Sequence, residues 1–253
     1  MRPTSFRTGD ITIHRIVESE APFVDAMEFL PSLTPEILDE HRSWLEPAAL
    51  EPATGKLIFC IQSYLVRTPH HVVLIDSCVG NDKNRPTAPS WHMKTGQTYM
   101  SALALAGIAV EDVDYVMCSH LHPDHVGWNT RLDNGRWVPT FPNAKYVFSR
   151  ADYDHYLKLD SDPKTGPVNA GSFRDSVLPV VEAGLTQMID GAARLDENLT
   201  VEPAPGHTPG TIAIKFGSGG EKALFCGDIL HHALQVYHPE WNSFACADAA
   251  GAR

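Results

Sequence analysis

The stretch that decides the fold reads Ser119-His120-Leu121-His122-Pro123-Asp124-His125-Val126-Gly127. It follows the compact apolar run 113–118, which is typical of a buried strand. At the end of an extended strand, side chains two residues apart point to the same side. His120 and His122 are therefore expected to face a single cation.

The second half of this motif offers ligands for another ion. Pro123 has a fixed φ and suits the first position of a helical turn, which would place Asp124 and His125 beside the first cation. Imidazole and carboxylate groups are ligands that zinc and related divalent metals accept, and catalytic sites keep one coordination position open. A random match to His-x-His-x-Asp-His in a chain of this length has a probability of roughly 0.002. The motif therefore predicts a metal centre.

Two later positions complete the pattern. His207 lies at the tip of the turn 205–210, which is rich in glycine and proline and separates two predicted strands. Asp228 follows the apolar run 224–226 and a single glycine, so it lies at the end of a predicted strand. A carboxylate at such a strand end can bridge two metal ions. Separately, they would be an ordinary turn histidine and an ordinary strand-end acid. One site accounts for both together with the main motif.

With these residues, the sequence resembles the metallo-β-lactamase superfamily, and within it the lactonase-like and glyoxalase II-like hydrolases. The resemblance extends from Leu74-Ile75-Asp76 through the metal motif to Gly227-Asp228. It implies a fold of the α/β (α+β) class, a four-layer αββα sandwich with the site on one edge of the two sheets. Asp76 matches a family position that supports the site from outside the ligand shell.

The resemblance also assigns the metal ligands. It implies His120, His122 and His207 for one metal, Asp124 and His125 for the other, and Asp228 as the bridge between them. The expected cofactor is two divalent ions, zinc first among them, which activate a water near neutral pH. Asp124 could relay a proton to the leaving group.

The region after Asp228 departs from the family pattern. Lactonases of this family carry a tyrosine three residues after the bridging acid, where this chain has His231. His231 could donate to the substrate oxygen or be a plain loop histidine. Only 25 residues follow Asp228, too few for the family's final histidine ligand, so we expect a fragment that lacks its last helix and strand. The second site would then be incomplete unless His231, His232 or His238 substitutes.

Length and composition are those of one globular domain over residues 1–253. The net charge of -11 argues against nucleic acid and anionic membranes as partners, so a small-molecule substrate is expected. The chain shows no apolar signal segment or spanning run, which favours a cytoplasmic location, and its five scattered cysteines are expected to be reduced. A homodimer is left open.

Periodicity predicts the surrounding elements. Strands are expected at 11–17, 57–66, 72–75, 113–118, 145–148, 199–201, 211–216 and 223–226, and helices at 35–44, 98–106, 151–159 and 172–189. Thr34 before Pro35 predicts the N-cap of the first helix, after a loop that begins at residue 18. Four residues near the motif are expected to shape a substrate pocket, namely Trp91, His92, Trp128 and Asn129.

The function expected from these residues is hydrolysis of an ester, lactone or related bond of a small molecule by a metal-bound hydroxide. One alternative is an iron-dependent redox enzyme similar to persulfide dioxygenases, and another is a non-catalytic metal-binding fragment. Diiron members of the superfamily usually carry a glutamate where His122 stands, which favours zinc here. Nuclease activity is disfavoured by the charge of -11.

Overall fold

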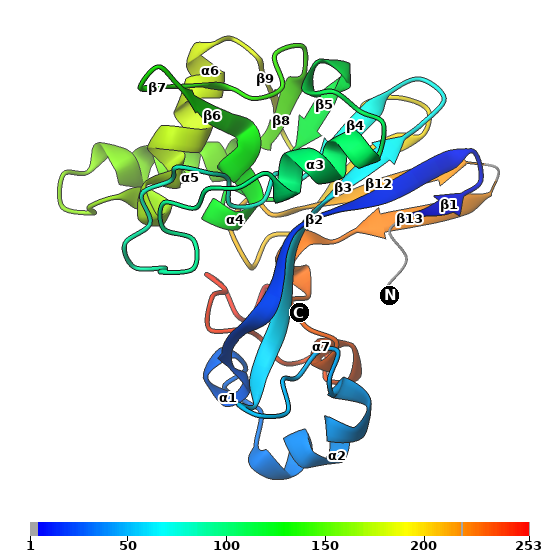
Figure 1. Ribbon diagram of the computed structural model, residues 1–253, viewed down its shortest axis with the longest axis vertical. Coiled ribbons are helices and arrows are strands. Elements are labelled where there is room, and N and C mark those ends of the chain that lie inside the picture. The colour runs from blue at the N-terminus through cyan, green and yellow to red at the C-terminus, as the bar shows by residue number, and fades with distance from the viewer. Residues whose placement is uncertain (1–4, 219, 253) are drawn as a thin grey trace.

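The computed structural model describes residues 5–218 and 220–252 and contains two stacked β-sheets, with helices packed against the outer face of the larger one (Figure 1). The larger sheet has seven strands, in the spatial order β1 (Ser5–Thr8), β2 (Ile11–Asp25), β3 (Lys56–Arg67), β4 (Val72–Ile75), β5 (Tyr115–Met117), β8 (Lys145–Ser149) and β9 (Thr186–Ile189). Strands β1 to β4 pair antiparallel, whereas β4, β5, β8 and β9 pair parallel.

The smaller sheet is antiparallel. Its four strands are β10 (Ala193–Arg194), β11 (Leu199–Pro203), β12 (Ile212–Ser218) and β13 (Glu221–Phe225). A separate hairpin is formed by β6 (Thr130–Asp133) and β7 (Arg136–Pro139).

Two hydrophobic cores hold the layers together. Val73 and Ile75 of β4 point into the core between the sheets, where they meet Ile214 and Phe216 of β12. Leu74 points the other way, into a core shared with helices α3 (Thr98–Leu105), α5 (Arg150–Ser161) and α6 (Leu178–Glu182). A strand buried on both faces explains why residues 72–75 are uniformly apolar. The two stacked sheets, with helices over the larger one, are the α/β arrangement that the sequence predicts.

A third core lies below the sandwich, at the end of the long arm that β2 and β3 form (Figure 1). The arm carries α1 (Ala26–Phe29) and α2 (Pro35–Leu45), and α7 (Leu234–Tyr237) packs beside them. The hydroxyl of Thr34 accepts a hydrogen bond from the Ile37 amide at 3.4 Å, as expected of an N-cap. Among the described residues, none of the helices has both the length and the apolar composition needed to cross a bilayer.

Most predicted elements are confirmed with small shifts in their ends, but two are wrong. The loop expected from residue 18 is in fact the continuation of β2, which pairs with β3 as far as Asp25 across two register shifts. Bulges hide the period of two that marks a strand. The helix expected at 172–189 ends at Glu182, and residues 186–189 form β9, because pairing with β8 overrides the helical pattern.

The β6–β7 hairpin was not predicted, although the sequence carries a signal for it. Asn134 and Gly135 have φ values of 49° and 78°, as in the tight turns that join antiparallel strands. Asn-Gly at this place is the short-range signature of such a turn.

Candidate metal centre

The central motif is positioned by the end of β5. His122 has an extended backbone with φ of -75° and ψ of 160°, and Pro123 begins the short helix α4 (Pro123–Val126). This change from strand to helical turn directs the side chains on both sides of Pro123 toward one point. The structure thus has the local geometry that the motif predicts.

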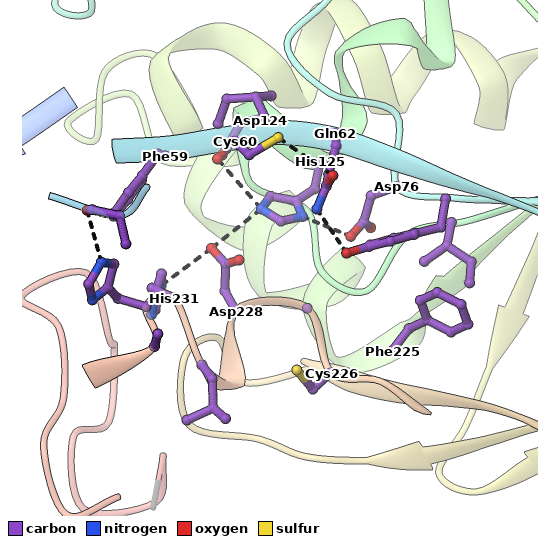
Figure 2. A pocket seen from close by; sticks show the side chains of 18 of the residues that line it. Phe59, Cys60, Gln62, Asp76, Asp124, His125, Phe225, Cys226, Asp228 and His231 are labelled. Atoms are coloured by element: carbon purple, nitrogen blue, oxygen red, sulfur yellow. Dashed lines mark hydrogen bonds and ion pairs between the residues drawn. The ribbon is translucent and has the colours of Figure 1, made fainter. Parts of the chain in front are cut away.

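Asp228 lies at the centre of a cluster of histidines. Its Oδ2 atom is 3.3 Å from His125 Nε2, 3.5 Å from His207 Nε2 and 3.8 Å from His120 Nε2. Figure 2 shows the contact between Asp228 and His125 beside the pocket. Histidines from two distant segments therefore converge on one carboxylate.

The remaining two predicted ligands, His122 and Asp124, each lie next to one of these histidines. His122 Nδ1 is 2.9 Å from His207 Nε2, and Asp124 Oδ2 is 3.5 Å from His125 Nε2. The structure brings together all six residues for which the sequence predicts metal binding.

These separations are the ones expected between two ligands of a common ion. Two atoms about 2.1 Å from zinc at a tetrahedral angle lie about 3.4 Å apart. The ligand atoms of His120, His122 and His207 lie within 4.8 Å of one another, and so do those of His120, His125 and Asp228. His120 Nε2 is buried without a hydrogen-bond partner among the described residues. A metal ion bound to its lone pair would satisfy this buried polar atom. The donor set therefore fits divalent metal ions.

The electrostatics of the cluster also suit a cation. Burial lowers the pKa of His207 to about 3 and that of His122 to about 4, so both are neutral and have a lone pair available at neutral pH. Burial also disfavours charge on His125, but the carboxylates of Asp228 and Asp124 outweigh it and hold the pKa of His125 well above its ordinary value. A metal ion at this point would take the place of that proton.

Asp76 supports the centre from behind, as the sequence predicts. Its Oδ2 is 2.9 Å from His125 Nδ1, and its two oxygens accept hydrogen bonds from the hydroxyl and the amide of Ser119 at 2.8 and 2.7 Å. Ser119 Oγ is in turn 3.1 Å from His120 Nδ1. Asp76 thus fixes the ring orientation of two histidines, leaving their Nε2 atoms for the metal.

We expect Asp76→Asn to weaken zinc binding by about 10–100-fold, because contacts of this kind orient the ligands. The measurement is a zinc titration of the metal-free protein in competition with a chelator. Asp114→Asn is the matched control, because Asp114 accepts a hydrogen bond from the amide of Val72 at the opposite end of β4. Equal affinities in the two variants would contradict this role.

Asp152 is a positioning residue that the sequence analysis missed. It is fully buried on α5 and accepts hydrogen bonds from the amide of Leu121 at 3.1 Å, the hydroxyl of Thr208 at 2.9 Å and the amide of Gly210 at 2.6 Å. A Cβ at Gly210 would lie 2.4 Å from the backbone nitrogen of Asp152, so only glycine fits there. Asp152 thus ties the main motif to the turn that carries His207.

A cavity of about 440 Å³ opens beside the cluster. One wall carries Asp124, His125, Asp228 and His231, and the other is strand β3 with Phe59, Cys60, Ile61, Gln62 and Tyr64 (Figure 2). Its size and its mixture of apolar and polar groups suit a small molecule.

The aromatic residues expected to shape this pocket lie elsewhere. Trp128 and Asn129 are buried, and the Trp128 indole donates a hydrogen bond to Glu18 at 2.8 Å. Trp91 stacks on Phe23 with ring centroids 5.6 Å apart. That expectation was wrong for Trp128 and Asn129, because closeness in sequence to a ligand does not place a side chain in its cavity.

Comparison with known proteins defines the class. The family model of the metallo-beta-lactamase superfamily matches residues 61–248, and the chain belongs to that superfamily.

Particular relatives have different degrees of similarity. The uncharacterized protein YobT of Bacillus subtilis (strain 168) is 25% identical over 176 residues, 68% of this chain and 62% of that protein. The N-acyl homoserine lactonase AttM of Azorhizobium caulinodans is 26% identical over 159 residues, 58% of this chain and 56% of AttM. The chain thus spans less than two thirds of the length of these curated relatives. AidC, a dizinc quorum-quenching lactonase solved with a product, shares the fold with a TM-score of 0.74 at 20% identity, covering 98% of this chain and 82% of that one.

Proposed function

We propose that this protein is a metal-dependent hydrolase that cleaves an ester, lactone or related acyl bond of a small molecule. The observation that carries the proposal is the convergence of His120, His125 and His207 on Asp228 at the wall of a cavity. Two divalent ions, zinc in this proposal, would supply Lewis acidity that lowers the pKa of a water and polarises the carbonyl.

The ligand set divides between two positions. His120, His122 and His207 would hold one ion, Asp124 and His125 the other, and Asp228 would bridge them. The first set is supported by the grouping of the ligand atoms of His120, His122 and His207 and by the orphaned Nε2 of His120 among the described residues. For the second ion, the support is that Asp124 Oδ2 and Asp228 Oδ2 lie 3.5 and 3.3 Å from His125 Nε2.

Asp124 is the proposed proton relay. It lines the cavity and lies 3.5 Å from His125. Burial raises the pKa of Asp124, but the charge of His125 and the hydrogen bond with it have the larger effect and hold this pKa below its ordinary value. The carboxylate is therefore ionised at neutral pH and can accept the proton of the attacking water and pass it to the leaving group.

We expect Asp124→Asn to lower kcat/KM by about 10²–10⁴-fold, the contribution typical of general acid–base catalysis. The amide keeps the shape of the side chain, so the melting temperature should change little. Steady-state kinetics and thermal unfolding of zinc-loaded protein measure both effects, and Asp154→Asn on the exposed face of α5 is the control. Wild-type turnover with a full metal complement would exclude Asp124 as the relay.

The cavity walls support the proposed substrate class. Phe59 and Ile61 offer apolar surface for an acyl group, whereas Gln62 and Tyr64 are polar anchors next to it. A lactone is supported by the similarity to AttM, whose name states that activity.

The five free cysteines favour a cytoplasmic location, which remains a prediction, as does a homodimer.

The experiment that tests this function is a panel of lactones, thioesters and phosphotriesters offered to the zinc-loaded protein. Hydrolysis of at least one acyl substrate that stops when a chelator removes the metal is the expected result. Oxygen uptake with a persulfide, without hydrolysis of any substrate in the panel, would contradict the proposal and favour the iron-dependent alternative.

A further inference from the structure

His231 is buried, and neither of its ring nitrogens makes a hydrogen bond with a described residue, although Nε2 lies at ion-pair distance from Asp228. Only 6% of its side chain is exposed, and Nδ1 and Nε2 make no hydrogen bond with any residue that the structure describes. Buried polar atoms of this kind are rare in folded proteins and point to a ligand or ion that satisfies them.

The Nε2 atom of His231 points at the metal centre. It lies 3.3 Å from Asp228 Oδ2, the same distance that separates His125 Nε2 from that oxygen (Figure 2). The ring centroids of His231 and His207 are 4.8 Å apart. The ligand atoms of His207, Asp228 and His231 all lie within 4.8 Å of one another, as in the two groups described above.

The chain around His231 holds the ring in this direction. Gln235 Oε1 accepts hydrogen bonds from the backbone amides of His231 at 2.8 Å and His232 at 3.2 Å. The amide group of Gln235 donates to the carbonyl of Trp241 at 3.1 Å, which anchors it to the following loop. Phe29 packs edge-on against the His231 ring, with centroids 5.2 Å apart. The side chain is thus preorganised toward Asp228.

We propose that His231 is a metal ligand, and that its Nε2 binds the ion that His207 and Asp228 also hold. The proposal rests on the metal centre described above and adds a fifth histidine to it. A histidine at this position would occupy a coordination site that would otherwise be open to water or substrate.

The direct test is binding of Co²⁺ to the metal-free protein, followed by visible absorption. His231→Gln is expected to change the intensity of the cobalt bands and to weaken binding at least about tenfold, since even residues that only orient a ligand have effects of this size. His232→Gln is the matched control, because His232 is also buried but its ring nitrogens face the carbonyl of Ala49 and the amide of Leu234. Unaltered cobalt bands and affinity in His231→Gln would overturn the proposal.

A second measurement needs no variant. In protein labelled with ¹⁵N-histidine and loaded with ¹¹³Cd, nitrogen–cadmium coupling counts the bound imidazoles. The proposal predicts coupling at the five clustered histidines, His120, His122, His125, His207 and His231. Coupling at the other four histidines without coupling at His231 overturns it while leaving the metal centre intact, and coupling at none overturns the metal centre as well. Neither readout depends on turnover, so a failed substrate panel would leave the role of His231 supported.

Discussion

His120→Ala is expected to remove tight metal binding and to abolish hydrolysis. His120 is 1% exposed, and its Nε2 has no hydrogen-bond partner among the described residues, which leaves its lone pair for the ion that we infer. Because contacts that merely orient a ligand are worth about 10–100-fold in affinity, losing the ligand itself should cost more than about 100-fold. His122→Ala should behave in the same way, since His122 Nδ1 lies 2.9 Å from His207 Nε2 in the same group.

The measurement is metal stoichiometry by mass spectrometry together with the rate of hydrolysis. His70→Ala is the control, because His70 is half-exposed and pairs with Glu197 away from the cluster. Full metal content and unchanged turnover in both His120→Ala and His122→Ala would refute the ligand assignment.

Asp228→Asn should have an effect of similar size, because one oxygen of Asp228 lies within 3.8 Å of His120, His125, His207 and His231. The substitution removes the single negative charge that would bridge the two ions. We expect the second ion to be lost and hydrolysis to fall by more than about 100-fold, as for the loss of any ligand. Zinc titration and turnover measure these two effects.

Asp228→Asn has a further consequence in the metal-free protein. The carboxylates of Asp228 and Asp124 hold the pKa of His125 well above its ordinary value against the effect of burial. Without the charge on Asp228, the protonated form of His125 is less stable, so its pKa should fall. An NMR titration of the imidazole resonances would show the shift, and an unchanged pKa of His125 would contradict the proximity of the two groups.

Local patterns explain why so much of the centre was predictable. His120, His122, Asp124 and His125 lie within six residues, so the alternation of a strand and the fixed φ of Pro123 determine their directions. His207 was found because it lies at the tip of a turn rich in glycine and proline, and Asp228 because it closely follows an apolar run.

The contributions of Asp152 and His231 depend on contacts that the sequence does not display. The backbone amide of Leu121 is 31 residues from Asp152, and Thr208 is 56 residues away. The orientation of His231 depends on Phe29, which belongs to the arm at the other end of the chain. The strand expected to end at Val17 continues as far as Asp25 because β3 pairs with it, which is again a long-range effect.

The most direct test of the central claim is a parallel titration of bound zinc and of hydrolysis in protein from which a chelator has removed all metal. We expect no hydrolysis in the metal-free protein, and a rate that rises with bound zinc and reaches its maximum when the second ion binds. Hydrolysis that persists without metal, or zinc binding that leaves every substrate of the panel intact, would contradict it.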